Sequence, residues 1–239
     1  MADQEVAKHV KKLLASVNAP EHRGWHKARE LLLECFIIVF AVSLSIWFHS
    51  LGEHRHEQQQ VKAFLLGLKG DIQNDIKQSR GVVSSHREFD LTYRYLTELD
   101  PVGRPEGKFD AAYAHVGNNA FLVPQDSRYE GFKSSGKLTN IENEALLENI
   151  VTLYQFDIPK VQMSSGGWRA SHTKLLDYIE TSMDGADTRE ARYKILTSPK
   201  GKRMTARMQT ISQLYERFAQ IERRSNEIIM QIDQAYPKG

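Results

Sequence analysis

Two histidines and a glutamate lie on one face of a predicted helix, directly after the most apolar stretch of the chain. His49, Glu53 and His56 are spaced i, i+4 and i+7, so this face could present two imidazoles and a carboxylate. Zinc takes such ligands. The same spacing also occurs on solvated helices that bind nothing, and these histidines could instead respond to pH. We therefore predict no metal and no cofactor.

Two serine-rich groups could suggest phosphate binding or nucleophilic catalysis. Neither Ser134-Ser135-Gly136 nor Ser164-Ser165-Gly166-Gly167 has the lysine and glycine spacing of a P-loop, so both are predicted to be helix stops and caps. Ser135 could be combined with His86 or His172 and an aspartate, but the spacing supplies no geometry for a triad. The glycine-flanked serine elbow of hydrolases is absent from the sequence.

The remaining polar groups and the single cysteine also give no evidence of a catalytic or metal-binding site. Asp71 and Asp75 stand at i and i+4, which is typical of the solvated face of a helix. The only cysteine, Cys35, excludes an intramolecular disulfide and the zinc sites that need two thiolates. A net charge of +2 in 239 residues gives no electrostatic reason to expect nucleic acid as a partner. We predict that the protein is not an enzyme.

Glu34 is the most informative single residue, because it stands one turn inside an apolar run. Glu34, Ile38, Ala41 and Ser45 share one helical face. In a membrane, small residues let a second helix approach, and a polar group can hydrogen-bond across the contact. This face is therefore a candidate transmembrane interface with a second copy or another membrane protein. Alternatively, Glu34 reaches the headgroups and the small residues are incidental.

The stretch that positions this face is LLLECFIIVFAVSLSIWFHSL, residues 31–51. As a helix its 21 residues extend roughly 30 Å, the thickness of a hydrocarbon core. We predict a transmembrane helix over 31–51. No small-residue cleavage site follows Trp47 and Phe48, so an uncleaved anchor is favoured over a signal peptide.

The flanks of this stretch indicate its orientation. Residues 1–30 form a basic segment, predicted to include an amphipathic helix over 4–17 that lies in the headgroup region. Six lysines and arginines precede the stretch (Lys8, Lys11, Lys12, Arg23, Lys27 and Arg29), and fewer follow it closely (Arg55, Lys62 and Lys69). This bias predicts a cytoplasmic N-terminus and an extracytoplasmic domain over 52–239.

Helical periodicity dominates the rest of the chain, and no alternating strand pattern appears. One long helix is predicted over 53–99 and another over 202–236, with shorter helices between them. Pro159 is expected to kink or interrupt the middle helices, and Gly166-Gly167 is a candidate for a second break. The predicted fold is all-α: one N-terminal transmembrane helix, then an antiparallel helical bundle with two long helices.

Several of these features together resemble an uncharacterised family of small bacterial single-pass membrane proteins with a domain of unknown function. The similar pieces are Lys11-Lys12-Leu13-Leu14, Glu34, Glu53, Phe64-Leu-x-x-Leu68-Lys-x-Asp71-x-x-x-Asp75 and Tyr129-x-x-Phe132-Lys133-Ser134-Ser135-Gly136-x-Leu138. The chain departs where the family has an asparagine-tryptophan pair, since Ser50 and Leu51 stand there. The resemblance implies a bacterial inner membrane location and no known activity.

These expectations lead to one function and one alternative. The first is a non-enzymatic accessory or scaffold protein whose partners are the lipid bilayer and either a membrane protein or further copies of itself. The alternative is a ligand-binding sensor domain that signals through a membrane partner, since helical bundles can transmit small helix shifts. A pocket with convergent polar groups would favour the sensor, and a large exposed apolar groove the scaffold.

Overall fold

The computed structural model describes residues 24–210 and 212–237, with side chains from residue 29 onward, and the chain divides into two units after Gln58. The described residues contain helices and no strand, so the all-α prediction is confirmed. The predicted amphipathic helix over 4–17 lies outside the described residues. The helices are α2 (Gly24–Glu98), α3 (Gly107–Ala114), α4 (Ser127–Ser134), η1 (Lys137–Asn140), α5 (Glu144–Thr152), η2 (Leu153–Asp157), α6 (Ile158–Thr181), α7 (Arg189–Thr197), α8 (Pro199–Ala206) and α9 (Ser212–Ala235).

Within the first unit, the described chain is the beginning of α2. The predicted stretch 31–51 is helical throughout, and none of its most apolar window is buried within the protein. By length and composition this is the one helix among the described residues that could cross a membrane. Its apolar side chains therefore suit contact with lipid rather than with a protein core.

Within the second unit, the later part of α2 carries the core. Its buried apolar side chains recur at spacings of three and four, as one face of a helix requires: Val61, Phe64, Leu65, Leu68, Ile72, Ile76, Val82, Phe89, Tyr93 and Leu96. The helix ends at Glu98, before the Asp100-Pro101 turn, as the sequence predicts. The α2 stripe is thus the surface on which the other helices pack.

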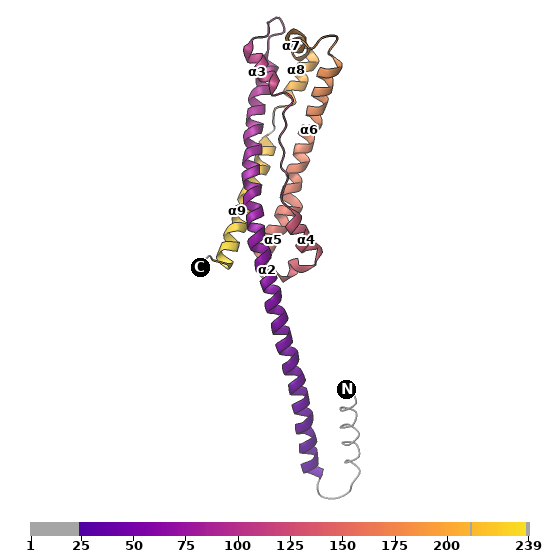
Figure 1. The fold of residues 1–239 in the computed structure, drawn as a ribbon, viewed down its shortest axis with the longest axis vertical. Coiled ribbons are helices and arrows are strands. Elements are labelled where there is room, and N and C mark those ends of the chain that lie inside the picture. Colours follow the sequence, from indigo (N-terminus) through magenta and orange to yellow (C-terminus); the bar gives the residue numbers. More distant parts are fainter. Residues whose placement is uncertain (1–23, 211, 238–239) are drawn as a thin grey trace. The chain divides into compact units, whose positions relative to one another are not determined.

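Helices α6 and α9, each 24 residues long, run beside this part of α2 (Figure 1). Lys69 pairs with Asp233 and Arg80 with Glu222, so α9 runs opposite to α2. Ion pairing of Arg224 with Asp157 shows that η2 lies against α9.

The core of this unit has two buried clusters. The larger one joins α2, α4, α5, η2, α6 and α9, and includes Leu68, Ile72, Tyr129, Ile150, Val161, Phe218 and Ile228. The other lies at the end of the unit where α3, α7 and α8 gather, and includes Tyr93, Leu96, Phe109, Leu175, Tyr193, Leu196 and Met208 (Figure 1). Burial of these side chains holds the fold without any disulfide, since Cys35 is free.

The prediction of one helix over 202–236 is wrong. The chain forms α8, which ends at Ala206, and α9, which begins at Ser212. Between them the Thr210 amide leaves the helical pattern and donates to Asp90 Oδ1 at 2.5 Å. Hydrogen bonding to α2 thus replaces helical bonding at this position, and it creates a joint between α8 and α9 over residues 207–210.

The break expected at Gly166-Gly167 is wrong, because both glycines lie inside α6. Near Pro159 the α-helical pattern is interrupted by the π-helical turn η2, although α5, η2 and α6 follow one another without a gap. Pro159 has no amide N–H to donate to the preceding turn. The π-helical turn η2 ends two residues before Pro159, and its wider hydrogen-bonding pattern accommodates the missing backbone hydrogen bond. Ser164-Ser165-Gly166-Gly167 lies inside α6, so its prediction as a helix stop fails. The stop predicted at Ser134-Ser135-Gly136 is confirmed, with Gly136 at a φ of 74°.

Gly201 permits a close approach that the fold requires. It is buried in α8, and a Cβ here would meet the backbone oxygens of Ile195 and, at 2.6 Å, of Leu196. We expect Gly201→Ala to lower the free energy of unfolding by about 1–3 kcal/mol through overpacking, measured by urea denaturation of the detergent-solubilised protein. Gly166→Ala is the control, because open space surrounds Gly166 inside α6. Gly166→Ala should raise the free energy of unfolding by about 1 kcal/mol. Equal effects of the two substitutions would contradict the close approach of the backbone to Gly201.

Candidate functional site

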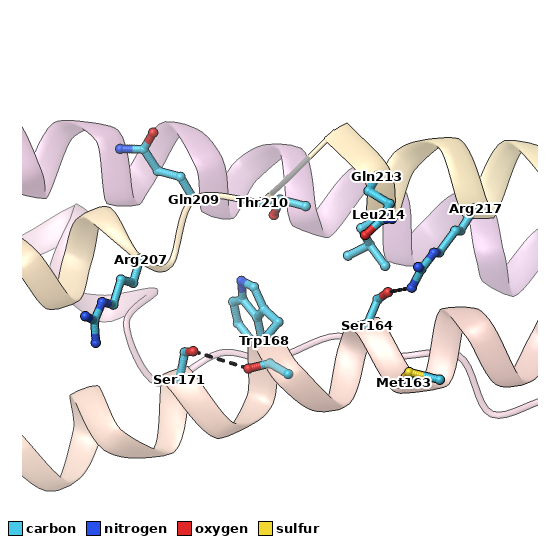
Figure 2. A pocket seen from close by; sticks show the side chains of 11 residues that line it. Met163, Ser164, Trp168, Ser171, Arg207, Gln209, Thr210, Gln213, Leu214 and Arg217 are labelled. Carbon is cyan, nitrogen blue, oxygen red and sulfur yellow. Dashed lines mark hydrogen bonds between the residues drawn. The ribbon is translucent and has the colours of Figure 1, made fainter.

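A cavity of about 420 Å³ lies between α6 and the chain from the α8–α9 joint into α9 (Figure 2). It has the size of a small-ligand site and lies wholly within the second unit. The residues that line it are Met163, Ser164, Gly167, Trp168, Ser171, Arg207, Gln209, Thr210, Gln213, Leu214 and Arg217. The break between α8 and α9 helps to shape this cavity, since Arg207, Gln209 and Thr210 come from the joint.

Trp168 forms the middle of this cavity and points from α6 toward the joint (Figure 2). Its indole stacks on Phe89, with ring centres 5.4 Å apart, and on His172 at 5.0 Å. Its Nε1–H donates to the backbone oxygen of Met208 at 3.0 Å. The ring is therefore held on several sides while one part of it remains available to the cavity.

The joint itself is fixed by α2. Asp90 accepts from the Thr210 amide and, through Oδ2, from the Tyr215 hydroxyl at 2.5 Å. His86 is 1% exposed, and its Nε2–H donates to the Ala120 oxygen at 3.2 Å while Nδ1 lies 3.2 Å from the Thr210 hydroxyl. Burial lowers the pKa of His86, so the neutral ring serves both contacts. The site is thus preformed by hydrogen bonds.

The charges that line this cavity are both positive. Arg207 and Arg217 lie toward its two ends (Figure 2). Arg217 NH1 donates to the Lys160 backbone oxygen at 3.0 Å and to the Ser164 hydroxyl. Among the described residues, the Arg207 side chain has no hydrogen bond or ion pair. With no acid in the lining, the cavity favours a ligand of negative charge.

Ser135, His86 and His172 are not brought together as a triad. The Ser135 hydroxyl is exposed and donates to the Phe132 oxygen at 2.7 Å. His172 is buried, and its Nε2 lies 2.6 Å from the Val116 oxygen. Both histidines instead contact Trp168 and support the cavity from the core side.

Asp75 is buried, contrary to its predicted place on a solvated face. It is 5% exposed, and the Gln125 amide donates to its two carboxylate oxygens at 3.0 and 3.2 Å. The pKa of Asp75 is raised from 3.8 to about 6, chiefly by burial and also by the charges of Asp71 and Asp126, while the hydrogen bond from the Gln125 amide opposes the rise. Asp71 does lie nearer the surface, where it pairs with Arg128.

Hydroxyl groups without a partner accompany this buried acid. The Tyr154 and Ser79 hydroxyls are buried and make no hydrogen bond within the described chain. Burial raises the pKa of Tyr154, and the charge of Asp75 raises it further. Asp75, Ser79 and His86 continue the spacing of three and four set by Leu68, Ile72 and Val82, so this register was the sequence signal for their burial.

The residues considered as metal ligands and the candidate interface residues all lie in the first unit. His49 Nε2 lies 3.2 Å from Glu53 Oε1, and both side chains are largely exposed. No group of three His, Cys, Asp or Glu residues able to hold a metal occurs in the part of the chain that the structure describes.

Glu34, Ile38, Ala41 and Ser45 all lie in α2, as predicted. Ile38, Ala41 and Ser45 are exposed and Glu34 is half-buried. Their use as an interface stays a prediction.

Comparison of the chain with models of protein families, with curated proteins and with solved structures gave no match. The resemblance to a bacterial membrane family therefore stays a prediction, and the function has to be inferred from the chain's own residues.

Proposed function

We propose that this is a non-enzymatic single-pass protein of the bacterial inner membrane that acts as an accessory or scaffold subunit. The observation that carries this proposal is the apolar stretch of α2, which no other part of the described chain buries. The lysine and arginine bias supports a cytoplasmic N-terminus and an extracytoplasmic helical domain. Opposite directions of α2 and α9 support an antiparallel bundle for that domain.

The proposed contact with a membrane partner is the face formed by Glu34, Ile38, Ala41 and Ser45. Ala41 and Ser45 leave room for a second helix, and Glu34 adds a polar group at one end. Ser43 lies on the opposite side of the same helix, because it is two residues from both Ala41 and Ser45. Ser43 therefore provides a matched position for a control.

We expect Ala41→Leu to weaken association in membranes by about tenfold, because a large side chain keeps the second backbone away. Glu34→Gln should weaken it less, since an amide can still hydrogen-bond. Crosslinking in membranes and purification in mild detergent, with identification of copurifying proteins, measure this association. Ser43→Leu is the control and should leave it unchanged. Recovery of the unaltered protein as a lone monomer, with no crosslink, would exclude the proposal.

A second candidate function, ligand sensing by the extracytoplasmic domain, is favoured by the cavity around Trp168. Its lining brings together hydroxyl, amide and guanidinium groups around an aromatic ring. Such convergence is typical of sites for small molecules. The exposed large apolar side chains of the second unit include Leu66 and Leu91 in α2, Val102 after it, Phe156 in η2 and Met230 in α9.

A further inference from the structure

We propose that the cavity around Trp168 binds a small ligand that joins an oxyanion to a planar apolar body. This inference rests on the ligand-sensing candidate and is independent of association through residues 34–45. It assigns a chemical class to a site of about 420 Å³ that sequence spacing does not reveal.

The oxyanion is indicated by the guanidinium groups. Arg207 is exposed and makes no side-chain bond to the described chain. Arg217 uses NH1 for Lys160 and Ser164, which leaves Nε and NH2 as donors. Asp90, which contacts Thr210 of the lining, already accepts from Thr210 and Tyr215. A carboxylate or phosphate at the Arg207 end of the cavity would therefore receive charge-assisted hydrogen bonds from that guanidinium group, with no acid in the lining to repel it.

The planar body is indicated by the indole and its surroundings. Trp168 is half-buried and is held by Phe89, His172 and the Met208 oxygen, so its ring is already oriented before a ligand enters. Met163 and Leu214 add apolar surface to the lining. A flat apolar ligand can pack against the part of this fixed indole that lines the cavity, at little entropic cost.

Gly167 supplies a way to fill the cavity without disturbing the fold. It lines the cavity inside α6, and a Cβ at this position would have nothing within 4 Å. Its neighbour Gly166 has equally open surroundings but does not line the cavity. Gly167→Leu and Gly166→Leu are therefore a matched pair, and both replace glycine with a better helix former.

The test is calorimetric titration of the full chain in detergent with four probes that share a naphthalene ring system. They are 1-naphthoate, 1-naphthyl phosphate, 1-naphthamide and 1-naphthylmethylammonium. We expect at least one anion to bind about tenfold or more tightly than the neutral amide, and the ammonium not to bind. Which of the two anions binds with the higher affinity distinguishes a carboxylate ligand from a phosphate ligand. Gly167→Leu should abolish binding, whereas Gly166→Leu should retain it.

The charge requirement has its own pair of variants. Arg207→Gln should weaken binding of the anion about tenfold, because it removes a charged donor that has no structural partner. Arg203→Gln removes an exposed charge from α8 that does not line the cavity, and it should change nothing.

Two results would overturn this inference in different ways. Equal affinity for the amide, still blocked by Gly167→Leu, would overturn the oxyanion but support ligand sensing at this site. No binding of any probe at about 1 mM would overturn both the oxyanion and the ligand-sensing candidate. Neither result would affect association through the membrane stretch.

Discussion

Replacing Arg224 with methionine is expected to lower the free energy of unfolding by about 3–5 kcal/mol, because it leaves a buried carboxylate without its charge partner. Arg224 Nε donates to Asp157 Oδ2 at 2.5 Å, and NH1 donates to Asn149 Oδ1 at 2.8 Å. The side chain of Asp157 is only 7% exposed. Urea denaturation of the detergent-solubilised protein at neutral pH measures the loss.

The neighbouring arginine provides the control for this prediction. Arg223 is exposed, and its NH2 donates only to Gln220 within the described chain. Arg223→Met should therefore change stability by less than about 0.5 kcal/mol. A double variant, Arg224→Met with Asp157→Leu, should recover much of the loss, since no unpaired charge is left behind. If Arg224→Met costs no more than Arg223→Met, the buried pair does not hold α9 against η2.

Replacing Asp75 with asparagine is expected to stabilise the protein at pH 8 by about 3 kcal/mol and to change little at pH 4. The folded-state pKa of Asp75 is raised from 3.8 to about 6, so the folded protein holds this proton more tightly than the unfolded chain. The stability due to Asp75 is thus complete below pH 3.8 and is lost as the pH rises through 6. Asparagine can still accept from the Gln125 amide but carries no charge.

Denaturation at several pH values measures this difference, and Asp71→Asn is the control. Asp71 lies one turn away and pairs with Arg128 near the surface, so its loss should leave most of the pH dependence in place. A constant difference between Asp75→Asn and the unaltered protein from pH 4 to pH 8 would show that folding does not raise the pKa of Asp75.

Much of the fold could be predicted from the sequence because apolar spacing reports helical faces directly. The stripe from Val61 to Leu96, the helix end at Glu98 and the stop at Gly136 all follow from local residue types. Ser198 likewise caps α8 through the Gly201 amide, as a serine before proline suggests. In these places local preference and tertiary packing agree.

Other features depend on partners that are distant in the sequence. The break between α8 and α9 needs Asp90, which is 120 residues from Thr210. Pro159 read alone suggests a kink or a break, yet the chain continues from η2 into α6 without a gap, and both elements pack against α9. The lining of the cavity comes from α6, the joint and α9, so no single stretch could reveal it.

The π-helical turn η2 also sets the phase of α6. The buried positions of α5, Leu146 and Ile150, and those of α6 from Val161 to Ile179 belong to one stripe, which would drift around a regular helix of 3.6 residues per turn. A π turn holds an extra residue and so absorbs the drift, and α5 and α6 both pack against α9. If the same residues formed a regular α-helix without the π turn, Ser164, Trp168 and Ser171 would lie about 100° further round the helix relative to α5. The geometry of the cavity is therefore encoded partly in a single inserted residue outside it.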